Sequence, residues 1–171
     1  WAAVLFTSLL GLNRSFSHEK EQGCLEGILL VPMDRSVIFL AKATANLIFL
    51  AVVSAVVVPL FFFFFLGQQG AAPSWPLMAV PLLVGAIGIA GVGTMLSTIT
   101  MNTRGKDVML AVLFIPLMFP LLWACVSATT AVMCGVDGFM DTFVTSMALA
   151  GGYDVVMILV SWVLYDFVVS A

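Results

Sequence analysis

The run PLMAVPLLVGAIGIAGVGTMLSTI at residues 76–99 contains no charged side chain and is long enough to cross a bilayer as an α-helix. Comparable apolar runs cover residues 37–66, 108–134 and 142–171, and a shorter run covers residues 1–12. Such runs lack the alternating polarity of β-barrel strands. Because lipid offers the backbone no hydrogen-bond partners, helices are expected. The sequence therefore predicts an all-α, polytopic transmembrane helix bundle with four to five spans.

The composition supports a single membrane domain over residues 1–171. The chain is 63% hydrophobic and 9% charged, whereas soluble domains carry about 25% charged residues. Its net charge of −3 argues against nucleic acid as a partner. The three cysteines, Cys24, Cys125 and Cys134, form neither a CxxC pair nor an even set, so no disulfide framework or metal site is predicted.

The first apolar run, residues 1–12, is too short to span a bilayer. The chain opens on Trp1 rather than on methionine, inside this run. We interpret the run as the second half of a partial span and expect further sequence upstream.

The basic side chains are distributed on one side of the predicted topology. All six lie in or beside the polar connections at residues 13–36 and 101–107, and none lies in the glycine-rich connections at 67–75 and 135–141; the six are Arg14, Lys20, Arg35, Lys42, Arg104 and Lys106. Lysine and arginine mark cytoplasmic loops. We therefore expect a multi-pass membrane protein whose polar loops, 13–36 and 101–107, are cytoplasmic.

Small residues recur at helical spacing in the run at 76–99. They are Ala86, Ala90, Thr94 and Thr98, with Gly85, Gly88, Gly91 and Gly93 beside them. Such rows allow helices to approach closely in lipid. The row is compatible with tight static packing and with a helix interface that moves. In the run at 108–134, Pro116 and Pro120 predict a kink.

The polar connection NRSFSHEKEQGCLEGILLVPMDRS at residues 13–36 predicts an amphipathic helix. Ser17 is suited to cap its start, and Pro32 to end it. Its apolar stripe either anchors it passively at the membrane interface or docks it on a soluble partner as a coupling helix. The candidate contact residues for such a partner are Glu19, Glu21, Gly23, Leu25, Glu26, Ile28 and Leu29.

Two carboxylates, Asp154 and Asp166, lie inside the last apolar run. An acidic side chain within a span marks a functional or paired site by default. Asp154 follows Gly151-Gly152, so we expect the helix to break there and to leave Asp154 hydrated near the outer interface. Asp166 is expected in headgroup water near the cytoplasmic end, with an ion pair to Lys42 as the alternative.

The sequence contains no recognisable catalytic motif. Gly105-Lys106 is followed by Asp107, and Thr100 stands where a phosphate-binding loop needs its first glycine. His18 is the only histidine, so the chain cannot supply a pair of histidine ligands. We predict no catalytic residue, no metal site and no firmly bound cofactor.

Several stretches together resemble one known family. They are WAAVLFTSLLGLNRSF at residues 1–16, EKEQGCLEGILLVPMDRS at 19–36 and FLAK at 39–42, followed by matches at 116–120, 136–139 and 152–154. In this order and spacing the chain resembles the CcmB family, the haem-exporter permease of cytochrome c maturation. The family has a small hydroxyl residue where this chain has Cys24, between Gly23 and Leu25-Glu26.

This resemblance implies an ABC-2-like permease with six spans, of which the first and part of the second are missing here. The implied partners are a CcmA-like ATPase and the membrane subunits CcmC and CcmD, with haem as the transported or handled group. Two alternatives remain open: a permease of the same fold for a drug, lipid or polysaccharide, and a membrane scaffold that transports nothing.

Overall fold

The computed structural model describes residues 1–21, 35–66, 75–100, 105–134 and 138–170. These residues form α-helices and one π-helical turn, and no strand occurs among them. The elements are α1 (Ala2–Glu21), α3 (Arg35–Phe61), η1 (Phe62–Leu66), α4 (Trp75–Thr100), α5 (Lys106–Cys134) and α6 (Phe139–Ser170). The prediction of an all-α helical bundle is confirmed.

Four helical segments are long and apolar enough to cross a membrane. They are Val37–Phe64, Pro76–Thr100, Val108–Cys134 and Phe139–Leu164, and the shorter apolar helix segment is Ala2–Leu12. The helices continue through internal prolines, since α5 is unbroken at Pro116 and Pro120. The protein is therefore a polytopic membrane protein.

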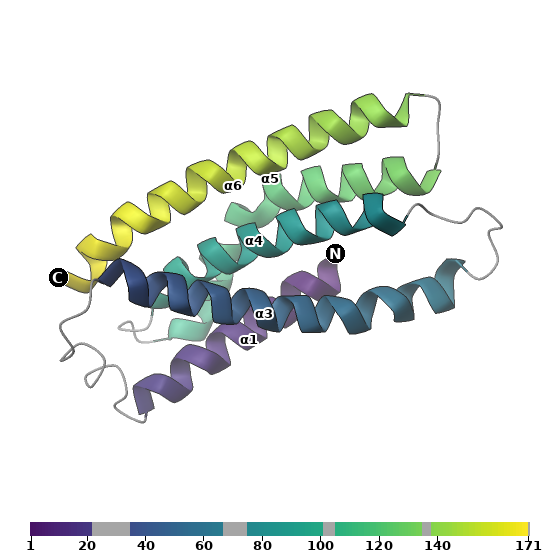
Figure 1. The fold of residues 1–171 in the computed structure, drawn as a ribbon. Coiled ribbons are helices and arrows are strands. Elements are labelled where there is room, and N and C mark those ends of the chain that lie inside the picture. The colour runs from purple at the N-terminus through teal and green to yellow at the C-terminus, as the bar shows by residue number, and fades with distance from the viewer. Residues whose placement is uncertain (22–34, 67–74, 101–104, 135–137, 171) are drawn as a thin grey trace.

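Helix α4 occupies the centre of the bundle and contacts α1, α3, α5 and α6 (Figure 1). Within the most apolar part of each helix, 61% of the residues of α4 are buried inside the protein, compared with 11% in α3. The small-residue row Ala86, Ala90, Thr94 and Thr98 is buried throughout. Because these side chains are short, four neighbours can approach the α4 backbone at once.

Successive helices run in alternating directions, so their ends collect at two poles of the bundle (Figure 1). The C-terminal ends of α1, α4 and α6 lie at the same pole as the start of α3 and of α5. This pole therefore carries the helix ends that contain or adjoin all six basic residues. The arrangement agrees with the charge distribution, and the assignment of this pole to the cytoplasm stays a prediction.

Helix α1 differs from the expectation at its C-terminal end. We expected a new helix capped by Ser17, but α1 continues without interruption from Ala2 to Glu21. No glycine or proline stands between Leu12 and Glu21, and the Glu and Lys residues there favour helix. The rest of the predicted amphipathic helix, residues 22–30, lies outside the described residues.

Candidate functional site

Asp154 lies on the inner face of α6, midway along the helix. Helix α6 is continuous through Gly151-Gly152, and the side chain of Asp154 is only 5% exposed. The expected helix break and interfacial hydration are therefore wrong. In lipid, a backbone that leaves the helix finds no other hydrogen-bond partner, so a glycine pair does not suffice to end it.

Gly88 of α4 makes room for the Asp154 carboxyl group. A Cβ atom at Gly88 would lie 2.1 Å from Asp154 Oδ1 and 2.5 Å from Leu121 Cδ2 of α5. Both distances are far below van der Waals contact, so a side chain at position 88 would displace the ends of the Asp154 and Leu121 side chains. The carboxyl group is thus enclosed where α4, α5 and α6 meet.

The polar surroundings of Asp154 are sparse. Its Oδ1 atom has no hydrogen-bond partner among the described residues. The neighbouring Tyr153 hydroxyl donates to the carbonyl oxygen of Leu117 in α5 and so ties α6 to α5. Asp154 is consequently a buried carboxyl group in an apolar setting, the kind of residue that marks functional sites within membranes.

Further hydrogen bonds join separate segments inside the bundle, among them two between polar side chains. Asn46 Nδ2 of α3 donates to Thr94 Oγ1 of α4 at 2.9 Å. Trp1 Nε1 donates to Thr129 Oγ1 of α5 at 3.0 Å. Asn46 could be noticed in the sequence as an amide inside an apolar run, but its partner on α4 could not be identified without the fold.

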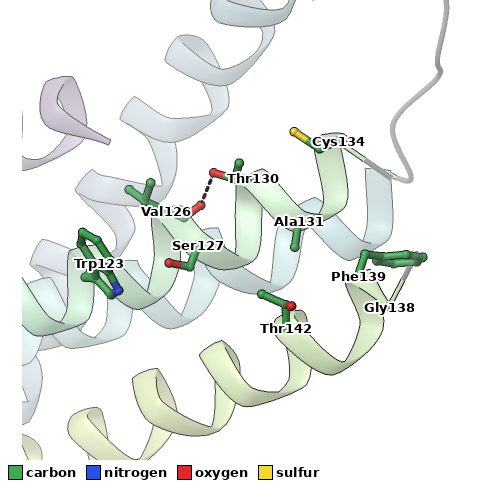
Figure 2. A pocket seen from close by; sticks show the side chains of 9 residues that line it. All are labelled: Trp123, Val126, Ser127, Thr130, Ala131, Cys134, Gly138, Phe139 and Thr142. Carbon is green, nitrogen blue, oxygen red and sulfur yellow. Dashed lines mark hydrogen bonds between the residues drawn. The ribbon is translucent and has the colours of Figure 1, made fainter. Parts of the chain in front are cut away.

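An apolar groove follows the outer face between α5 and α6. One section encloses about 430 Å³ beside Trp123, Ser127, Ala131 and Thr142 (Figure 2). In Figure 2, Ala131 of α5 and Thr142 of α6 point toward each other across this section. A second section, about 820 Å³, shares Trp123 and continues along Phe119. Trp123 is 69% exposed, so the groove opens to the surrounding lipid.

The described residues form no cluster of metal ligands. No group of three or more His, Cys, Asp or Glu side chains is gathered among them. A third cavity, about 260 Å³, lies beside Trp1, Phe62, Met78 and Met133. This volume is smaller than the roughly 300–1,000 Å³ of typical ligand pockets.

The side chains of the remaining predicted site residues lie outside the described ones. Glu19 and Glu21 belong to the last turn of α1, although their side chains are outside the described ones. The segment that holds Gly23, Leu25, Glu26, Ile28 and Leu29 lies outside the described residues altogether. Asp166 belongs to α6, and its side chain lies outside the described ones. Their roles stay predictions.

Comparison with known proteins identifies the relatives of this chain. The relatives are three proteins named "Heme exporter protein B", and the alignments cover 122 residues, or 71% of this chain. The protein from Pseudomonas aeruginosa is 30% identical over 53% of its own length, and that from Rhodobacter capsulatus is 27% identical over 55%. The protein from Paracoccus denitrificans is 26% identical over 55% of its length.

The chain thus spans about half the length of the curated relatives it matches. No solved structure matches it. A family model described as "CcmB protein" matches residues 1–169, which is nearly the whole chain. The chain therefore belongs to the CcmB protein family.

Proposed function

We propose that this protein is the membrane permease subunit of an ABC-type transporter that acts in haem export or handover for cytochrome c maturation. A separate CcmA-like ATPase drives it, CcmC- and CcmD-like subunits accompany it, and the complex resides in the bacterial inner membrane. The observation that carries the proposal is the family match over residues 1–169, together with relatives named for haem export. On this proposal the chain carries no catalytic residue, and ATP is hydrolysed in the partner.

The described architecture supports a permease. Four helices can cross the membrane. The central helix α4 contacts its neighbours through small residues. Because few long side chains interlock there, the helices can shift against one another. Asp154 is buried at the junction of three of these helices. A scaffold without transport has no need of a costly buried carboxyl group at such a junction.

The proposed coupling route begins at α1. Because α1 is one continuous helix from the apolar segment Ala2–Leu12 to Glu21, a push at its C-terminal end is transmitted along a rigid element to the contact with α4. Glu19, Glu21 and Glu26 give a docking surface its charge, and Leu25, Ile28 and Leu29 give it an apolar centre. The ATPase subunit is the proposed occupant of that surface.

Haem, on this proposal, is a cargo or handled group that the chain does not bind firmly. The test is deletion of the gene in its host, followed by haem staining of the c-type cytochromes. We expect covalent haem to disappear from these cytochromes and to return when the gene is restored. Normal maturation of c-type cytochromes in the deletion strain would refute the proposal.

The same experiment separates the alternatives. A permease for a drug, lipid or polysaccharide would leave cytochrome maturation intact and change the export of that other substrate. For the scaffold alternative, an ATPase inactivated at its phosphate-binding lysine is co-expressed with the intact membrane protein. A transporter then fails to mature cytochromes, whereas a scaffold needs only the presence of the ATPase and continues to work.

A further inference from the structure

Buried polar atoms without partners gather on two packed helices. Three side-chain oxygens among the described residues are buried and lack a hydrogen-bond partner: Ser97 Oγ of α4, and Asp154 Oδ1 and Ser161 Oγ of α6. Helices α4 and α6 pack against each other. A hydroxyl group left unpaired is a modest loss, but an ionised carboxylate left unpaired in an apolar medium is far more costly. Of the three side chains, Asp154 is therefore the one whose ionisation would destabilise this interface most.

Helix α6 packs against α3, α4 and α5, and none of the side chains described on these helices brings a positive charge beside Asp154. Helix α4 presents Gly88 and contains no titratable residue. Helix α5 presents Leu121, and its Cys125 is near enough to interact with a charge on Asp154, as is Tyr153 of α6 itself. A thiol and a phenol are neutral or negative, so neither can compensate a carboxylate.

Cys134 ends α5 and Asp141 lies at the start of α6, and neither carries a positive charge. The basic side chain that the structure describes on these helices is Lys42 of α3. It lies about two turns into α3, at the pole where α6 ends, whereas Asp154 lies midway along α6 (Figure 1). The enclosed carboxyl group is thus unpaired by any charge that the structure describes beside it.

We propose that Asp154 is a proton-binding site whose occupancy depends on the contact between α4 and α6. While Gly88 lies against it, the carboxyl group keeps its proton and is neutral. When α4 and α6 separate, water enters, the O–H bond breaks, and the proton passes to water, which leaves a hydrated carboxylate on α6. The ligand is a proton alone, so no other reactant is needed.

This link makes helix separation sensitive to proton concentration. Closure of the interface takes up one proton and separation releases it, so acid favours the packed arrangement and alkali the separated one. The proposal does not depend on the identity of the cargo, since it concerns the packing of two helices of this chain.

The test is infrared spectroscopy of the full-length protein in lipid vesicles, recorded as a function of pH. We expect a carbonyl band of a protonated carboxylic acid near neutral pH, shifted by ¹³C-labelled aspartate and absent in Asp154→Asn. Deuterium exchange of this band should be slow, because water does not reach the packed interface. Absence of any band that Asp154→Asn removes would overturn the proposal.

A second variant tests the dependence on packing. Gly88→Ala places a methyl group where the carboxyl oxygen lies, so the carboxyl group must leave its enclosed position against α4. The band should then be lost near neutral pH and return on acidification. Gly152→Ala is the matched control, because a Cβ there meets nothing within 4 Å, and it should keep the wild-type band. An unchanged band in a folded Gly88→Ala protein would contradict the dependence of proton binding on the contact between α4 and α6. If that variant fails to fold, the comparison with Asp154→Asn still decides whether Asp154 binds the proton.

Discussion

Individual hydrogen bonds between helices contribute measurably to this bundle because lipid supplies no competing partners. The bond from Asn46 to Thr94 joins α3, the most lipid-exposed of the spanning helices, to the central helix α4. Such bonds contribute about 0.6 kcal/mol on average and at most about 1.7 kcal/mol in a membrane protein.

We predict that a double-mutant cycle of Asn46→Ala and Thr94→Val gives a coupling free energy of roughly 1 kcal/mol. The measurement is the free energy of unfolding in lipid bicelles. Thr44→Ala serves as the control, because the Thr44 hydroxyl bonds only to carbonyl oxygens of its own helix. A coupling energy near zero would show that the two helices are not held by this contact.

At the same scale, Asp154 shows which part of the site could be predicted. Its presence inside an apolar run is visible in the sequence, and so is the small-residue row of α4. The contact between Asp154 and Gly88 joins positions 66 residues apart, and no helical period within one segment relates them. The expected break at Gly151-Gly152 failed because a glycine pair lowers helix propensity by only about 1 kcal/mol per residue, less than the loss of backbone hydrogen bonds in lipid.

Among the elements, α4 should be sensitive to added side-chain volume and α3 should not. Ala90 on α4 is 2% exposed, whereas Ala51 on α3 is exposed. We predict that Ala90→Leu destabilises the protein by about 1–3 kcal/mol, because the extra atoms force neighbouring helices apart. Ala51→Leu should leave stability unchanged, since its side chain meets lipid. The measurement is the thermal unfolding temperature of both variants in the same detergent. Equal changes in the two variants would contradict the central position of α4.

The continuity of α1 can be tested with a proline. If Ser17 capped a new helix, proline at position 18 would be the first helical residue and would be tolerated. In the continuous α1 that the structure shows, position 18 is interior, and His18→Pro should cost about 3 kcal/mol of helix stability.

The readout is the distance between spin labels at positions 10 and 21, measured by pulsed electron paramagnetic resonance. Along a continuous helix the labelled backbones are about 16 Å apart, with a narrow distribution that His18→Pro broadens. A broad distribution in the protein without proline would mean that α1 ends before Glu21.

The existence of the spanning helices was predictable, because apolar runs of more than twenty residues leave the backbone in lipid no alternative to helix. The path of the chain through residues 13–21 was not predictable, because polar residues that can cap a helix can equally continue one. In this segment Ser17 competes with strong helix formers on both sides, and the helix that arrives from the membrane is already nucleated, so propagation is favoured.

For the molecule as a whole, the distribution of basic residues predicts its orientation. We expect a membrane-impermeant thiol reagent added to intact cells to modify a cysteine placed at position 70 and to leave one at position 103 unmodified. The native cysteines, including the exposed Cys134, are first replaced by serine. Labelling at position 103 in sealed cells would show that the orientation is the reverse of the one predicted.

The central claim is that a separate ATPase drives this membrane subunit through residues 13–36, and co-purification tests it most directly. Glu21→Lys combined with Glu26→Lys reverses the charge of the proposed docking surface, and Asp141→Lys is the control, because Asp141 is exposed at the opposite pole. We predict that the double variant loses the ATPase while the membrane subunit stays abundant, and that the control retains it. Undiminished co-purification of the ATPase with the double variant would contradict the account.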